Sequence, residues 1–230
     1  MEFSLLGAAV IAAVGLYGVL WYEAGRTNPA ESARELWDLV LGAAVIGLVA
    51  GRLAAMIRGG TNPISHPGDI LIVRGGVDTV AASLSALGAL GIMARRDLWV
   101  RLDAIAPAVL GGLAAWHGAC LARSACLGTP SGLPWAFSAN EGGVTRHPTE
   151  LYAATLLILG VVVLIWWKRH HPAPGAVAGI ALAVAAGVRL ATEPLRPVLG
   201  SGLEWWYLAA VVAGLGVALG RVIRSRSTHR

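Results

Sequence analysis

Apolar residues fill seven long segments of the chain, and short polar stretches rich in arginine, proline and glycine separate them. Each segment is about 20 residues long, the length that a helix needs to cross roughly 30 Å of hydrocarbon. Lipid offers the backbone no hydrogen-bond partners, so only helices and closed barrels span a bilayer, and runs this long favour helices. The pattern predicts an all-α bundle of about seven transmembrane helices, at about 4–22, 37–57, 76–94, 102–122, 149–167, 175–193 and 203–222.

The composition supports a membrane protein over a soluble domain, because 56% of the residues are hydrophobic and 13% are charged. The 30 glycines suit helices that approach one another closely. The first apolar run has no basic leader and no small-residue cleavage site, so we expect a retained helix and not a signal peptide. Without internal repeats or linkers, residues 1–230 are predicted to form one membrane domain with a short outer loop at about 123–147.

The basic residues indicate the orientation. With seven spans, eleven of the 18 lysines and arginines fall in the loops of one side and at the C-terminus, and five fall on the other side. The positive-inside rule therefore puts the C-terminus in the cytoplasm and the N-terminus outside. The net charge of +5 does not indicate nucleic-acid binding, because no basic patch with interleaved aromatic residues occurs.

Several ionisable residues lie within or at the edges of the apolar runs: Arg52, Asp78, Asp103, His117 and Arg189. Such residues usually face the interior of a bundle and pair with one another, and this structural explanation stays open here. The alternative is a polar cavity for a lipid head group. Arg189 and Glu193 share a helix face at i and i+4, and Pro194 ends that helix before Arg196. Two arginines beside a carboxylate are suited to clamp a phosphate.

The fourth run carries a further candidate pair. His117 and Cys120 are three residues apart on one helix face and are either a base with its nucleophile or an ordinary packed pair. A disulfide between Cys120 and Cys126 requires the helix to end between them. No glycine-rich phosphate loop and no metal-ligand motif occur in the sequence, so no cofactor and no metal is predicted.

The segment Arg146-His147-Pro148-Thr149-Glu150-Leu151-Tyr152 resembles the Arg-His-Pro-Ser-Gln-Leu-Tyr motif of prolipoprotein diacylglyceryl transferases. The likeness covers about residues 37–222. Arg189, Glu193 and Arg196 match that family's Arg-x-x-x-Glu-x-x-Arg, and Asp103 to Pro107 resembles its Asp-x-Ile-Ala-Pro. Further matches are Gly51-Arg52 and the segment from Pro174 to Gly179.

The resemblance implies a multi-pass protein of the bacterial inner membrane. Such enzymes transfer a diacylglyceryl group from phosphatidylglycerol to the lipobox cysteine of a secreted lipoprotein precursor, at the outer face of the membrane. Glycerol phosphate is released. Phosphatidylglycerol and a lipoprotein precursor are therefore the expected partners, though another acceptor stays open.

Two family signatures are altered in this chain. The His-Gly-Gly motif reads Arg74-Gly75-Gly76, and the arginine and first asparagine of Gly-Arg-x-Gly-Asn-Phe correspond to His117 and Cys120. In one interpretation the chemistry has moved: His117 and Arg74 face one cavity, with His117 as the base and Arg74 on the phosphate. In the other, the chain is a catalytically inactive paralogue that binds phospholipid or assists membrane assembly.

The resemblance then gives each candidate a role. The catalytic candidates are His117, Arg74 and Glu193, the last of which organises the arginines. The substrate-binding candidates are Arg189, Arg196, Arg146, His147, Tyr152 and Cys120.

We predict that a C-terminal reporter is cytoplasmic and that one inserted at 129–145 is periplasmic, because the basic residues are so unequally divided between the two sides. Paired fusions to alkaline phosphatase and to green fluorescent protein measure this directly. Opposite signals would move the proposed site to the inner face and exclude a secreted acceptor.

Overall fold

The computed structural model describes residues 2–24, 32–65, 68–71, 76–120, 127–138, 143–170, 172–196 and 204–227. The chain divides into two compact units. The smaller unit is Glu31–Arg101, and the larger unit combines Met1–Ala30 with Leu102–Arg230.

Each of the seven predicted apolar runs contains a helix. They are α1 (Glu2–Ala24), α2 (Ala33–Arg58), α4 (Thr79–Met93), α5 (Leu98–Ala119), α6 (Thr149–Lys168), α7 (Ala176–Thr192) and α8 (Glu204–Ser227). Within the described residues, α2, α5, α6, α8 and the stretch Ala176–Leu195 are long and apolar enough to cross a membrane. Gly7–Glu23 and Thr79–Met93 are shorter apolar stretches, so a multi-pass helical protein is supported while the count of seven spans stays a prediction.

Four short elements were not predicted from the apolar pattern. They are α3 (Gly68–Leu71), the 3-10 helix η4 (Glu193–Leu195), and the strands β1 (Phe137–Ser138) and β2 (Thr145–Arg146). The two strands pair in antiparallel fashion, with Phe137 opposite Arg146. The hairpin lies in the predicted polar loop, directly before α6.

In the smaller unit, α2 packs against α4 through small residues, and two of the ionisable residues singled out above have partners there. The side chain of Arg52 donates to the carbonyl oxygens of Asp69 and Gly76, at 3.0 and 2.9 Å. Asp78 accepts from the backbone N–H of Ala81 at the start of α4 and pairs with Arg58. These contacts fit the structural explanation for both residues.

In the larger unit, Asp103 also has a structural partner. Its carboxylate accepts from the backbone N–H groups of Gly175 and Ala178, both at 2.7 Å. The residue before α7, Gly175, has no side chain to cap the helix, so a carboxylate from α5 satisfies donors that the first turn leaves free. Asp103 thereby fixes the start of α7 against α5.

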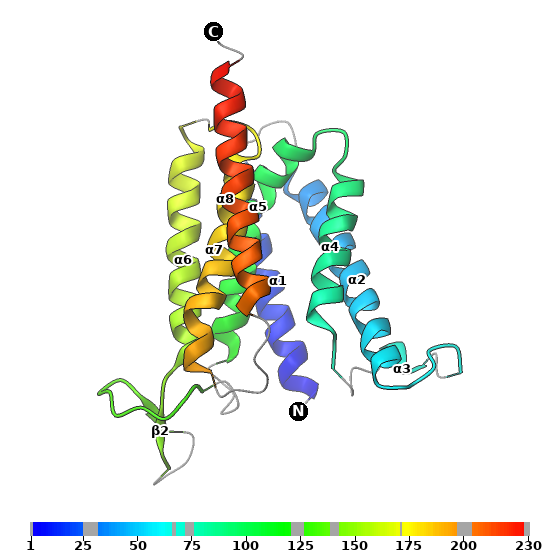
Figure 1. Ribbon diagram of the computed structural model, residues 1–230, viewed down its shortest axis with the longest axis vertical. Coiled ribbons are helices and arrows are strands. Elements are labelled where there is room, and N and C mark those ends of the chain that lie inside the picture. Colours follow the sequence, from blue (N-terminus) through cyan, green and yellow to red (C-terminus); the bar gives the residue numbers. More distant parts are fainter. Residues whose placement is uncertain are drawn as a thin grey trace. The chain divides into compact units, whose positions relative to one another are not determined.

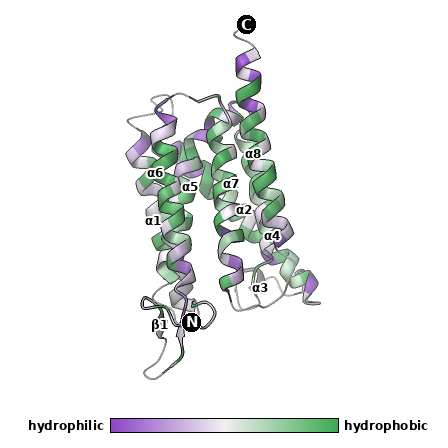
Figure 2. Ribbon diagram, turned by 60° about the vertical axis from the view of Figure 1, so that its left-hand side comes forward, coloured by the Kyte–Doolittle hydropathy of each residue, from purple (hydrophilic) through white to green (hydrophobic). Residues whose placement is uncertain are grey.

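The course of the larger unit brings several helix ends together. Figure 1 shows α1, α6 and α8 beginning, and α5 and α7 ending, at the end where the N-terminus lies, while α8 finishes at the opposite end. In Figure 2 the ribbon of these helices is coloured mainly as hydrophobic along the middle, and hydrophilic colours gather near the ends. Large exposed side chains such as Leu159, Val163 and Val212 suit contact with lipid.

A close helix contact in this unit joins α7 to α8 at two glycines. A Cβ on Gly214 would lie 2.5 Å from the carbonyl oxygen of Gly179 and 2.7 Å from the nitrogen of Ala183. A Cβ on Gly179 would lie 2.6 Å from the carbonyl oxygen of Gly214. The two backbones therefore touch, as small residues allow in membrane helix pairs.

We predict that Gly214→Ala destabilises the protein by about 1–3 kcal/mol, because the added methyl group forces the two helices apart. Thermal unfolding in detergent measures this. The matched control is Gly216→Ala in the same helix, where a Cβ meets nothing within 4 Å. That control should be neutral or stabilising by up to about 1 kcal/mol, because alanine has the higher helix propensity. Equal midpoints for the two variants would contradict the close contact.

Candidate functional site

A buried carboxylate links three segments at the end of the larger unit where α1 begins. Glu150 lies in the first turn of α6 and is 7% exposed. One oxygen, Oε2, contacts Nδ1 of His117, in the last turn of α5 and also 7% exposed. The other, Oε1, lies 2.8 Å from Nη1 of Arg196, the residue after η4. The start of a helix favours a negative charge, so the position itself supports an ionised Glu150.

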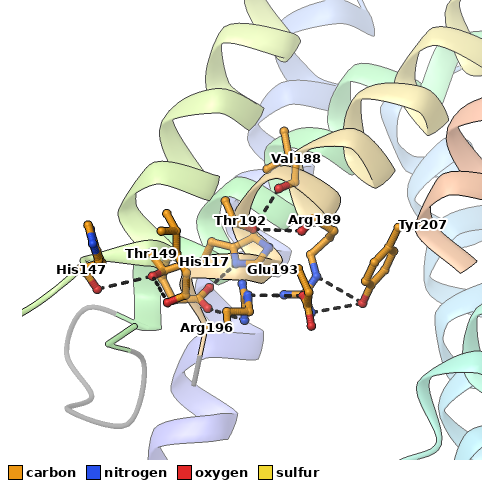
Figure 3. Close-up of polar contacts among 11 residues, drawn as sticks. His117, His147, Thr149, Val188, Arg189, Thr192, Glu193, Arg196 and Tyr207 are labelled. Atoms are coloured by element: carbon orange, nitrogen blue, oxygen red, sulfur yellow. Dashed lines mark hydrogen bonds and ion pairs between the residues drawn. The ribbon is translucent and has the colours of Figure 1, made fainter. Parts of the chain in front are cut away.

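From Arg196 the polar contacts continue to α8. Glu193 Oε2 lies 3.9 Å from Nε of Arg196 and 3.7 Å from Nη2 of Arg189, which confirms that Arg189 and Glu193 share a helix face. Nη2 and Nε of Arg189 donate to the hydroxyl of Tyr207 at 3.2 and 3.4 Å, and the guanidinium carbon lies 5.4 Å from the centre of the ring. Figure 3 shows this set of side chains from His147 to Tyr207.

Among the residues that the structure describes, this network contains two acids and two arginines, so their charges balance when His117 is neutral. Glu193 follows the last turn of α7, where the helix dipole disfavours an acid. The arginines on either side offset that cost. Glu193 therefore stands where the sequence predicted an organiser of the two arginines, although its role in catalysis stays a prediction.

Some buried polar atoms of the site lack a hydrogen bond. Among the described residues, Nε and Nη2 of Arg196, Oε2 of Glu193 and Nδ1 of His147 have no hydrogen-bond partner. An unsatisfied buried group costs about 1–3 kcal/mol, and native proteins rarely retain one without a reason. Nε and Nη2 form one edge of the guanidinium, with two parallel donors. This edge is suited to two oxygens of one phosphate group.

A group of hydrogen bonds, called the clasp below, holds the start of α6 against the end of η4. The N–H of Gly128 donates to the carbonyl of His147 at 2.8 Å, and the N–H of Thr129 donates to the carbonyl of Leu195 at 2.8 Å. The hydroxyl of Thr149 also donates to the carbonyl of Leu195, at 3.3 Å. The clasp thus fixes the segments that carry Glu150 and Arg196, which is why the two side chains meet.

The remaining substrate-binding candidates on the hairpin side make local contacts. Arg146 donates to the carbonyl of Gly128 at 3.2 Å, and the rings of His147 and Tyr152 meet edge to face at 6.2 Å. The hydroxyl of Tyr152 accepts from the indole N–H of Trp135 at 2.9 Å. Arg146 and Tyr152 therefore help to hold the hairpin and the loop before it in place, and their binding roles stay predictions.

The cysteine and Arg74 predictions have different outcomes. Cys120 is disulfide-bonded, so the alternative in which its thiol is a nucleophile paired with His117 is wrong for this structure. Cys126, which the sequence analysis considered as the disulfide partner of Cys120, lies outside the described residues. Arg74 lies outside them too, so its pairing with His117 stays a prediction. His117 itself contacts an acid that the sequence reasoning had not placed in the site.

Sequence reasoning missed Glu150 and Tyr207. For Glu150 a signal existed, because the family motif has glutamine at that position. No signal identified Tyr207, which is one of several aromatic residues near the start of α8.

Comparisons with known proteins agree on one family. The profile of the family described as prolipoprotein diacylglyceryl transferase matches residues 2–223. Three similar proteins are each named phosphatidylglycerol–prolipoprotein diacylglyceryl transferase. The one from Methylobacillus flagellatus is 28% identical over 211 residues, covering 85% of this chain and 79% of the relative. That of Bordetella bronchiseptica is 26% identical over 232 residues, covering 94% and 87%. That of Methylococcus capsulatus is 32% identical over 184 residues, covering 74% and 67%.

We predict that Gly128→Ala opens the clasp and destabilises the protein by about 1–3 kcal/mol, because its Cβ would overlap the Thr149 hydroxyl and the Leu195 carbonyl. Thermal unfolding and hydrogen exchange at the amides of residues 128 and 129, the two backbone donors of the clasp, measure the effect, and exchange should be faster. In the same loop, Gly132→Ala meets nothing within 4 Å and serves as the control. A variant with wild-type exchange at both amides would show that the clasp does not depend on this glycine.

Proposed function

Because this chain belongs to the prolipoprotein diacylglyceryl transferase family, we propose that it transfers the diacylglyceryl group of phosphatidylglycerol to the cysteine of a lipoprotein precursor. The chain is thus a transferase enzyme. We place the reaction at the outer face of the bacterial inner membrane, because the family resemblance implies that membrane and face and the basic residues predict the orientation of the chain. The relatives are named for the same two substrates.

The observation that carries this proposal is the buried edge of Arg196, which makes no hydrogen bond to the described residues and meets Glu193 only at an ion-pair distance, 3.9 Å from Nε to Oε2. A phosphodiester supplies two oxygens at the spacing that such an edge recognises. Arg189, whose side chain is 30% exposed, adds a second positive charge on the far side of Glu193. The buried Oε2 of Glu193 is an acceptor, and a hydroxyl of the glycerol head group is a matching donor.

His117 is the base in this scheme. Its Nδ1 is held by Glu150, which leaves Nε2 for the substrate thiol. The thiol gives its proton to Nε2, and the sulfur attacks the glyceryl carbon that carries the phosphate. The carbon–oxygen bond breaks, and its electron pair leaves with the phosphate oxygen of glycerol phosphate. Arg196 and Arg189 stabilise the charge that develops there. The imidazolium then returns its proton to the phosphate or to water.

A second candidate is the inactive paralogue that binds phospholipid. The specific observation in its favour is that the His-Gly-Gly motif is absent and Arg74 stands in its place. One assay separates the two. Purified protein is incubated with phosphatidylglycerol liposomes and a lipobox peptide, and the peptide mass and glycerol phosphate are measured. A diacylglyceryl adduct together with released glycerol phosphate supports the transferase, whereas lipid binding without either product supports the paralogue.

We predict that Arg189→Ala weakens phosphatidylglycerol binding by about 10-fold or more while the protein stays folded, since a charge-assisted hydrogen bond contributes about 1.5–3 kcal/mol. Lipid binding in detergent and the thermal midpoint are measured together. Arg226→Ala, at an exposed position in the last turn of α8, is the control and should change neither. An Arg189→Ala protein that unfolds would instead support a structural ion pair with Glu193.

A further inference from the structure

The contact between His117 and Glu150 joins two positions at which this chain departs from the family motifs it resembles. The matching motifs have arginine where His117 stands and glutamine where Glu150 stands. The two residues come from different helices, both are 7% exposed, and their side chains meet. We propose that Glu150 is a positioning residue: it fixes His117 as the base and couples that base to the phosphate-binding Arg196. This inference rests on the proposed function.

Each oxygen of the Glu150 carboxylate serves one partner. Oε2 accepts a hydrogen bond from the N–H at Nδ1 of His117, while Oε1 accepts a hydrogen bond from Nη1 of Arg196 at 2.8 Å. A neutral imidazole carries one N–H, so a proton held on Nδ1 leaves the lone pair on Nε2. The carboxylate thereby selects the tautomer that can accept a proton from a thiol. It also fixes the angle of the ring, because both of its oxygens are engaged.

The charges of the site suit a proton transfer coupled to loss of a phosphate. With His117 neutral, Glu150 and Glu193 balance Arg189 and Arg196. When His117 takes the thiol proton, the network gains one positive charge. At the same time the leaving phosphate gains one negative charge. Glu150 stabilises the imidazolium that forms, so the site matches the charges of the transition state better than those of the ground state.

A purely structural role for Glu150 is the competing explanation, because a buried acid that pairs with Arg196 also ties α6 to the end of η4. The two roles differ in what a substitution changes. A structural role lowers stability and lipid binding together, and the chemical step changes only as a consequence. A positioning role lowers kcat while phosphatidylglycerol binding and the fold persist.

Glu150→Gln separates these roles because an amide has only one acceptor oxygen. If that oxygen stays on Arg196, the NH2 group faces Nδ1 of His117 and donates to it. The imidazole proton must then sit on Nε2, where it blocks the base. The variant therefore keeps the Arg196 contact and inverts the tautomer, which should lower kcat by about 100-fold or more. Because the phosphate contacts remain, KM for phosphatidylglycerol should stay within about threefold.

The experiment measures kcat, KM and the thermal midpoint for the wild-type chain and for Glu150→Gln, in phosphatidylglycerol proteoliposomes with a lipobox peptide. Glu204→Gln is the matched control, because Glu204 is an exposed acid in the first turn of α8 and also becomes an amide. A chemical rescue adds a readout that a structural role would not alter. Free imidazole should restore activity to His117→Gly, and the restored rate should fall about 10-fold or more in the Glu150→Gln background.

Loss of kcat with retained KM and midpoint, together with loss of imidazole rescue, supports the positioning role. It is overturned if Glu150→Gln keeps the wild-type kcat, if its loss appears in KM and the midpoint instead, or if imidazole rescues both backgrounds equally. A wild-type chain that binds phosphatidylglycerol but forms no peptide adduct overturns the proposed function itself, which is a separate result.

Discussion

The site depends on one buried carboxylate, that of Glu150. An ionised acid away from water is stable only when cations and donors surround it, so its position requires His117 on one oxygen and Arg196 on the other. Three segments that are far apart in the sequence must therefore come together at one point. Removing Arg196 would leave the charge of Glu150 unmatched, and removing His117 would leave Oε2 without its donor. The arrangement of α5, α6 and the end of η4 is therefore mutually dependent.

Other contacts in the larger unit hold the segments around Glu150 at the positions that its two hydrogen bonds require. Backbone hydrogen bonds at Gly128 and Thr129 hold the start of α6 to Leu195, and Asp103 fixes the opposite end of α7 against α5. The contact of Gly179 with Gly214 sets how near α8 lies to α7, and so brings Tyr207 within reach of Arg189. Each of these contacts fixes the position of the backbone. The long, flexible side chains of the arginines need such a fixed backbone to reach the same place each time.

The family comparison and the geometry of the site give different kinds of support for the proposed function. Membership of the diacylglyceryl transferase family, whose relatives are named for phosphatidylglycerol and prolipoprotein, supports phospholipid and lipoprotein partners. The geometry adds an arginine edge that has no hydrogen bond within the described chain, and a histidine held by an acid. Arg74 stands where the family motif has histidine, and the base that we propose instead is His117, in the last turn of α5. The two departures at His117 and Glu150 are chemically complementary, which an isolated loss of function would not produce.

The sequence alone determined the helical class, because hydrophobic runs of membrane length leave the backbone little choice but a helix. It also determined that Arg189 and Glu193 share a face, since that spacing is a local property of a helix. Only the tertiary structure decided that Glu150 meets His117 and Arg196, that Tyr207 meets Arg189, and that Asp103 caps α7. These contacts cross between segments, and a single sequence carries no record of which helices pack together. The sequence offered Glu150 only as an acid at the start of an apolar helix, and packing made it the centre of the site.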